Sequence, residues 1–233
     1  MQFLAFLNLS FGQNEYINTD RPDQSDGVYV IPKNKWQIEN GVTISKQTFM
    51  NNFMLRYGLN GSSEVRLLID AGKEDAVKGV KPLAFSVKQN IVNQRALLPA
   101  ITFVGYVYFS QVSTKAFRPA NIPFELKLAF ENELNKEVSI GYNIGTSEQF
   151  QQMNCSFNIG YTALDKLLVF GEYFSSFTKF IPQHNFDVGL QYKITPALQI
   201  DIASGRSIAD KNNRFFTTLG VSYILNERKM LPD

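Results

Sequence analysis

Ten ionisable side chains occur in segments where polar and apolar residues alternate, and these are the chain's candidates for binding or selecting a solute: Glu39, Arg56, Arg66, Asp70, Lys88, Lys127, Glu172, His184, Asp187 and Asp201. Acids occupy three successive segments in the C-terminal third, and bases occupy earlier segments. Opposed walls of opposite charge in a narrow pore select small ions or zwitterions. The same charges can also neutralise one another and plug the space, so both interpretations stay open.

His184 is the only histidine and therefore the only imidazole available as a catalytic base. A serine nucleophile needs such a base beside it, but the residue two positions on is Phe186 and no Gly-x-Ser-x-Gly motif occurs. Cys155 is the only cysteine, so the chain has too few cysteine and histidine ligands for a zinc site. We expect no enzyme activity, no metal and no cofactor. His184 is then either a rim residue bonded to a carboxylate or water, or part of a constriction with Glu172, Asp187 and Asp201.

The composition narrows the classes of protein. The 233 residues contain no run approaching the ~20 apolar residues of a spanning helix. The net charge of +2 and the absence of a basic stripe argue against nucleic acid as a partner. The mean hydropathy of −0.15 suggests a soluble protein. That average misleads for a membrane barrel, however, because its lipid-facing and lumen-facing residues alternate and cancel.

Alternation with period two runs from Trp36 to Leu225 and is the primary signal of β-strands. Near the C-terminus, for example, Leu198, Ile200 and Ile202 fall on one face and Gln199, Asp201 and Ala203 on the other. Residues 99–110 and 167–175 are apolar on both faces, so their facing is ambiguous. A soluble sandwich alternates too, and the pattern by itself does not separate the two architectures.

The lengths of the links separate them better. Short links at 60–63, 135–136, 165–166 and 195–196 alternate with longer polar links at 71–81, 111–122, 146–152, 178–183 and 206–214. Outer-membrane barrels have short periplasmic turns and longer extracellular loops. Tyr57, Tyr161, Tyr192 and Tyr223 precede the short turns and would form one aromatic belt. We therefore predict an all-β chain: a single closed antiparallel transmembrane β-barrel of about twelve strands over residues 36–225.

The N-terminal segments differ from the barrel. Residues 1–12 are apolar and end in Ser10-Phe11-Gly12, which fits the remnant of a cleaved signal peptide; the alternative is a buried first strand. Residues 13–35 are polar and contain two prolines, so we expect a periplasmic or lumenal arm. Asp20, Arg21 and Asp23 are its candidate plug residues. Arg21 would bind inward carboxylates and hold the arm in the barrel; otherwise the arm is a solvated tail. Residues 226–233 form a C-terminal tail.

Several stretches resemble one known family. They include 19–24 (TDRPDQ), 36–41 (WQIENG), 141–145 (GYNIG) and 182–190 (PQHNFDVGL). The family is the outer-membrane transporters named for the meta-cleavage pathway of phenol degradation. The resemblance implies an outer-membrane barrel that acts as a transporter. The chain departs from the pattern in its C-terminal extension and its lack of a terminal Phe or Trp, which puts in doubt how the assembly machinery reads the last strand.

These features predict a channel for passive passage of small solutes, aromatic or hydrophobic ones among them, in the bacterial outer membrane. The partners would be outer-membrane lipid, the solute and the barrel-assembly machinery. The alternative function is a closed, non-conducting barrel that serves as a structural or partner-docking protein.

Overall fold

The computed structural model describes residues 17–22, 24–119, 123–178, 182–208 and 215–225. Two short 3-10 helices, η1 (Ser110–Val112) and η2 (Lys115–Phe117), lie in the link after β6. The strands are β1 (Trp36–Ser45), β2 (Thr48–Gly58), β3 (Ser63–Glu74), β4 (Val77–Val80), β5 (Leu83–Val92), β6 (Ala100–Phe109), β7 (Phe124–Glu133), β8 (Val138–Ser147), β9 (Gln152–Leu164), β10 (Leu167–Phe177), β11 (Gln183–Thr195), β12 (Leu198–Ser207) and β13 (Phe215–Leu225).

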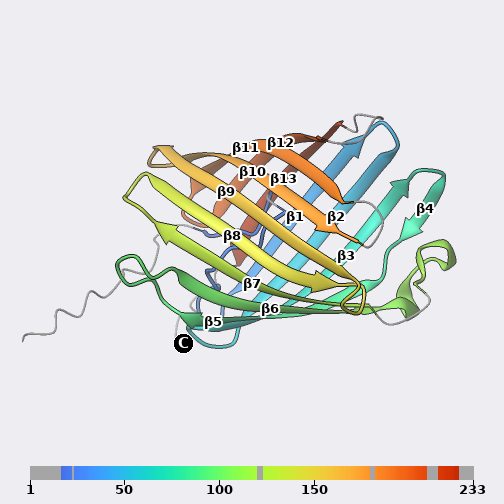
Figure 1. Cartoon of the computed structure of the whole chain (residues 1–233), viewed down its shortest axis with the longest axis horizontal. Helices are drawn as coiled ribbons and strands as arrows, with labels where there is room; N and C mark the ends of the chain where they lie inside the picture. Colours follow the sequence, from blue (N-terminus) through green and yellow to red (C-terminus); the bar gives the residue numbers. More distant parts are fainter. Residues whose placement is uncertain (1–16, 23, 120–122, 179–181, 209–214, 226–233) are drawn as a thin grey trace, which may run out of the picture.

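The sheet closes on itself, so the fold prediction is confirmed. Consecutive barrel strands pair antiparallel from β1 to β13, with β5 pairing directly to β3. The last strand then pairs with the first, from Trp36↔Leu225 to Ser45↔Phe216. The short β4 pairs with β3 alone and lies outside this ring. Twelve strands therefore form a closed barrel, shown in Figure 1, which leaves no edge strand in the ring.

Two ends of the barrel differ in their connections. The short turns after β2, β7, β9 and β11 lie at one end, which we call the turn end, and the longer connections lie at the other, the loop end (Figure 1). Two links depart from this rhythm: residues 93–99 form a longer link from β5 to β6 at the turn end, and only Lys46 and Gln47 join β1 to β2 at the loop end. The Ser45 hydroxyl oxygen accepts hydrogen bonds from the backbone N–H groups of Gln47 and Thr48, which makes so tight a turn possible.

The expected loop at 71–81 is largely strand. β3 continues to Glu74, and β4 returns beside it with Ala71↔Val80 as the first pair. A salt bridge of 2.8 Å joins Lys81 Nζ, just after β4, to Glu74 Oε2, beside the turn of the hairpin. The backbone satisfies its hydrogen bonds by extending the ladder beyond the barrel, which a polar composition alone did not indicate.

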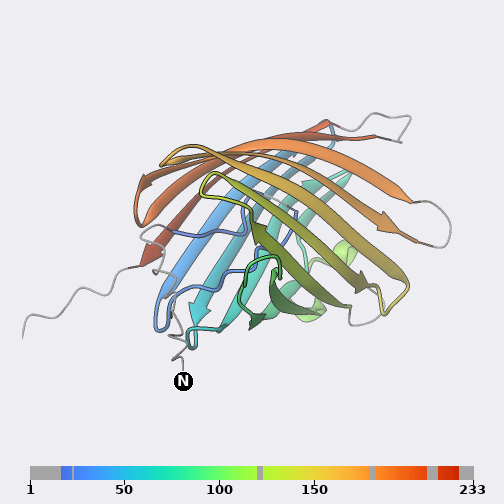
Figure 2. The same cartoon turned by 60° about the vertical axis from the view of Figure 1, so that its left-hand side comes forward.

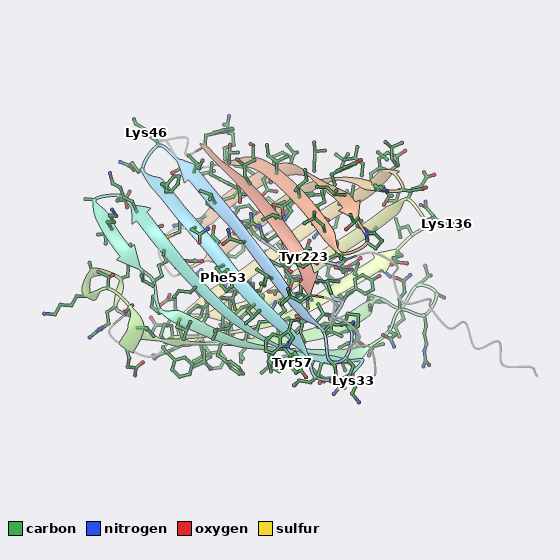
Figure 3. The ribbon with its side chains drawn as sticks, turned by 180° about the vertical axis from the view of Figure 1, so that it is seen from behind. Lys33, Lys46, Phe53, Tyr57, Lys136 and Tyr223 are labelled. Atoms are coloured by element: carbon green, nitrogen blue, oxygen red, sulfur yellow. The ribbon has the colours of Figure 1, made fainter. Side chains whose placement is uncertain are left out.

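The outer wall is apolar and the inner wall is polar. Leu219, Val221 and Tyr223 on β13 are among the exposed large apolar side chains, whereas Asp201 on β12 is 5% exposed. Figure 3 shows Phe53 midway along the wall, Tyr57 and Tyr223 towards the turn end, and lysines at both ends. Such an apolar band fits a membrane barrel. Among the described residues, no helix is long and apolar enough to cross a membrane.

The two ambiguous segments are now resolved. On β6, Ala100, Thr102 and Val104 are buried inside the barrel, and Val107 and Phe109 are exposed outside. On β10, Phe170 and Glu172 point inward and Val169 points outward. Both faces of these strands are apolar in part because the inner wall carries a small apolar cluster, which consists of Val28, Ala100 and Ala129.

Candidate functional site

The N-terminal arm, residues 17–35, runs through the inside of the barrel. The Ile17 N–H donates to the Pro196 carbonyl oxygen at the turn end, 2.7 Å away. The Asn34 N–H donates to the Gly58 carbonyl oxygen at the same end, 2.8 Å away. Between these two points the blue segment of Figure 2 enters the lumen and returns. Ile17, Val28 and Ile31 are at most 3% exposed, so the arm is packed rather than solvated.

Asp20 of the arm meets the basic wall. Its carboxylate lies 2.7 Å from Lys88 Nζ, 2.9 Å from an Arg66 nitrogen and 3.4 Å from an Arg56 nitrogen. These side chains project inward from β5, β3 and β2. Burial raises the pKa of Asp20, but the three cations outweigh burial and hold the pKa at about 2. Asp20 is therefore ionised and clamped at neutral pH.

Asp26 makes the second acidic contact of the arm. It lies 2.7 Å from Arg66 and 3.0 Å from Lys127, and the Tyr106 hydroxyl donates to it over 2.7 Å. Burial opposes its ionisation, but Lys127 and Arg66 hold the pKa of Asp26 well below its ordinary value. Together, Asp20 and Asp26 bridge strands β2 to β7 from within.

Arg21 points to another part of the wall, where β12 carries Asp201 and β13 carries Thr218. One guanidinium nitrogen lies 2.8 Å from the Thr218 hydroxyl and 3.4 Å from an Asp201 carboxylate oxygen. Space for the guanidinium comes from Gly41 and Gly220, where a Cβ atom would overlap it. Consecutive arm residues thus contact different parts of the lumen wall: Asp20 meets the bases of β2, β3 and β5, and Arg21 meets the acid of β12.

Glu172 on β10 holds the middle of the arm. Its carboxylate accepts the backbone N–H groups of Gln24 and Ser25 at 2.8 and 2.9 Å, and the Ser25 hydroxyl as well. Its cross-strand neighbour Asp187 is fully buried, yet neither of its carboxylate oxygens has a hydrogen-bond partner among the described residues. Glu172 therefore binds the arm, whereas the carboxylate of Asp187 is buried beside it with no hydrogen-bond donor among the described residues.

Arg56 joins two further acids. It lies 2.6 Å from Glu39 and 2.9 Å from Glu64, and Glu64 also accepts the Ile31 N–H over 2.7 Å. Glu39 was expected on this face and Glu64 was not. The sequence did offer a signal for Glu64: it lies two residues before Arg66 on β3, and residues two apart share a face of a strand. Asp26 was missed because it lies in an irregular segment without a period.

The remaining candidates lie apart from this network. Asp70 is half-buried on β3, four residues nearer the loop end than Arg66. His184 is placed wrongly by the constriction hypothesis: it stacks with Tyr173 and contacts Phe177, and the Tyr173 hydroxyl lies 2.7 Å from its Nδ1. Side chains three residues apart on a strand point to opposite faces, so His184 faces outward because Asp187 faces inward. Asp23, residues 1–12 and residues 226–233 lie outside the described residues.

Above the arm, a cavity of about 500 Å³ opens at the loop end; we call it the vestibule. Gln24 of the arm belongs to its lining, and so do inward residues at the loop-end termini of β7 to β11. The lining combines amides, hydroxyls, one ion pair and aromatic rings, among them Asn143, Asn154, Asn185, Ser156, Glu125, Lys127, Tyr108, Phe124 and Phe174. Its volume is that of a site for a small molecule.

A family model described as "Putative MetA-pathway of phenol degradation" matches residues 19–225. The chain belongs to this family. The match covers the arm from Thr19 and the entire barrel, so the resemblance of the sequence stretches is confirmed. No curated protein matches the sequence. The fold agrees with that of outer-membrane barrels, in which the short turns lie on the periplasmic side.

Solved structures with the same fold are porins and related barrels. The KdgM porin has a TM-score of 0.66 at 10% identity and covers 82% of this chain and 99% of that chain. The NanC porin has a TM-score of 0.61 at 9% identity, with coverages of 81% and 98%. Omp33 of Acinetobacter baumannii has a TM-score of 0.53 at 10% identity, with coverages of 83% and 99%. At such identities the likeness concerns the fold.

Proposed function

We propose that this family member is an outer-membrane channel for the passive passage of small solutes, and that its N-terminal arm controls the lumen. The observation that carries the proposal is the vestibule whose floor is the arm. Gln24 lines the vestibule, and its backbone N–H is held by Glu172. A solute could enter the vestibule from the loop end and pass on through the barrel when the arm moves away from its contacts with the wall.

The arm's anchors have the character of a movable element. They are mainly charged and polar contacts, whose groups water can hydrate once the arm has moved. The arm also buries three apolar side chains, Ile17, Val28 and Ile31, and Val28 packs with Ala100 and Ala129 of the wall. At about twelve strands a barrel is wide enough to hold such a segment, unlike an eight-stranded barrel filled by side chains.

The vestibule supports small, weakly polar solutes, including aromatic ones. Amide and hydroxyl groups of Asn143, Asn154 and Ser156 provide hydrogen bonds, while Phe174 provides apolar surface. The KdgM structure in complex with oligogalacturonate concerns an acidic saccharide. Here Lys127, the cation of the vestibule, is already paired with Glu125 and Asp26. An uncharged solute therefore fits this lining better than an acidic one.

Planar-bilayer conductance of the refolded protein tests the proposal. We expect small, fluctuating conductance in the wild type and larger, steadier conductance in Arg21→Ala, because this substitution removes the arm's contacts with Asp201 and Thr218. Lys46→Ala, at the loop-end turn, is the matched control and should leave conductance unchanged (Figure 3). The absence of conductance from both the wild type and Arg21→Ala would favour the closed, partner-docking barrel.

We also propose that residues 1–12 direct export and are removed, that residues 13–35 act as one unit as the arm, and that the barrel-assembly machinery inserts the chain into outer-membrane lipid. Export and removal are supported by the apolar stretch that ends in Ser10-Phe11-Gly12. Mass spectrometry of the protein from outer membranes should give a chain that begins at Gln13. A chain that retains residues 1–12 would contradict the proposed cleavage.

A further inference from the structure

The seam between β7 and β8 is shorter than its two neighbours at the loop end. The β6–β7 ladder reaches Val107↔Phe124, and the β8–β9 ladder reaches Ser147↔Gln152. The β7–β8 ladder, in contrast, ends at Leu126↔Thr146. Residues 124–125 and residue 147 therefore have no ladder partner across this seam, and we call this unpaired stretch of the wall the notch.

Two hollows lie on opposite sides of this seam. The vestibule is on the inside, and a groove of about 480 Å³ is on the outside, lined mainly by the outward side chains Phe103, Leu126, Leu128, Ile144, Phe150 and Met153. Three residues, Lys127, Gly145 and Gln152, contribute to both hollows. Only the wall of these strands thus separates the polar vestibule from an apolar groove that faces lipid.

Two phenylalanines close the notch. Phe124 borders the vestibule but shares the outward face of β7 with Leu126, and Phe150 lines the groove. Their rings are in edge contact, with centroids 5.1 Å apart and planes at 71°. Phe150 is nevertheless 68% exposed. The contact is a pair of rings at the rim of the wall with little else packed over it.

The turn that carries Phe150 is strained. Glu148, Gln149 and Phe150 have φ angles of 49°, 57° and 67°, so three successive residues other than glycine adopt the left-handed region. Each costs roughly 1–2 kcal/mol relative to ordinary backbone. Strain of this kind persists where the position of a side chain matters, and here the turn places one ring against Phe124.

We propose that the notch between β7 and β8 is a side exit, through which a small apolar solute passes from the vestibule into the outer leaflet, with Phe124 and Phe150 as the movable barrier. This inference rests on the proposed function and names its solute class and route. The occupant is an apolar molecule because the groove is apolar and lies directly against the vestibule. The arm closes the axial route below, whereas the notch offers a route that requires no release of the arm.

The first test seals the barrier. Phe124→Cys/Phe150→Cys is made with Cys155→Ser, so that no third thiol lines the vestibule. The matched control, in the same background, is Ser204→Cys/Thr217→Cys on β12 and β13, where the hydroxyls are 2.9 Å apart on directly paired residues. Oxidation and a short thiol crosslinker link each pair, and mass spectrometry counts the links.

The readouts are the entry of N-phenylnaphthylamine, an apolar dye, into Gram-negative cells, and ionic conductance in planar bilayers. We expect the linked barrier to lower dye entry to the rate of cells without the protein, with conductance unchanged. Opening the disulfide with a reductant should restore entry, and the control link should alter neither readout. Unchanged dye entry through a linked barrier would overturn the side exit. A wild type that passes neither dye nor ions would instead refute the proposed channel.

A second variant needs no crosslink. Ile144→Trp fills the groove from a side chain that is 50% exposed, and Ile140→Trp places the same bulk on β8 outside the groove. We expect slower dye entry for Ile144→Trp alone, with both variants folded as judged by heat-modifiable migration on gels. Equal dye entry for the two folded variants would overturn the side exit.

Discussion

Gly41 and Gly220 are directly paired across the seam where the last strand meets the first, and the Arg21 guanidinium occupies the space that their missing side chains leave. The seam that closes the barrel is therefore also the seam that holds the arm. Two small residues on neighbouring strands open a slot in the inner wall, and Thr218 and Asp201 supply the polar contacts at its edge.

Filling that slot should release the arm. Gly41→Ala and Gly220→Ala each place a methyl group on the guanidinium, so we expect Arg21 to lose its contacts with Thr218 and Asp201 and the arm to open more often while the barrel stays closed. Proteinase K should then cleave within residues 17–35, and mass spectrometry of the fragments would locate the cut. Gly61→Ala is the control, since a Cβ at Gly61 meets no atom within 4 Å. Full protection of the arm in both seam variants would contradict this role.

Asp20 should be the strongest single anchor of the arm. Asp20→Asn leaves Arg56, Arg66 and Lys88 buried without this counter-charge, and removing one partner of a buried ion pair costs about 3–5 kcal/mol. Hydrogen exchange of the arm amides measures the change in the free energy of docking. Glu74→Gln breaks the exposed pair with Lys81 and should cost only about 0–1 kcal/mol, with arm exchange unchanged. Equal exchange in the two variants would refute the anchor.

The contribution of Asp20 should persist into acid. Its pKa is lowered from 3.8 to about 2 in the folded protein, so its ion pairs stabilise the docked arm fully above pH 3.8 and are lost as the pH falls through about 2. The difference in docking free energy between the wild type and Asp20→Asn should therefore be the same at pH 7 and pH 4 and vanish below pH 2. Hydrogen exchange corrected for its intrinsic pH dependence measures it. A difference already lost at pH 4 would contradict the clamp.

Asp187 and Asp201 should respond in opposite directions to the same substitution. Asp187 is buried beside Glu172 with both oxygens unpartnered, so Asp187→Asn removes a like-charge contact and should stabilise the barrel by about 1–3 kcal/mol. Asp201→Asn removes the partner of Arg21 and should loosen the arm. Urea unfolding followed by the fluorescence of Trp36 measures the first effect, and arm proteolysis measures the second. Destabilisation by Asp187→Asn would show that its carboxylate is compensated.

The sequence by itself determined the barrel. Alternation is a local property, because successive side chains on a strand point to opposite faces, so it gave the inner positions of Arg56, Lys88 and Asp201 without any knowledge of pairing. The lengths of the links are also a local property, and they predicted which end of the barrel carries the short turns. Even the outward position of His184 follows from its spacing to Asp187. The strand character of 71–81 did not follow, because a ladder extends only when the neighbouring backbone is in place.

Only the tertiary structure decided what lies inside and where the wall is weak. The sequence predicted that Arg21 would bind inward carboxylates, but the partners themselves, Asp201 for Arg21 and Lys88 for Asp20, lie far apart in the chain and follow no period. The notch beside Phe124 depends on the different lengths of three neighbouring ladders, which depend in turn on how the strands are staggered as the sheet closes. Local patterns specify the face of each residue, whereas closure specifies its neighbours.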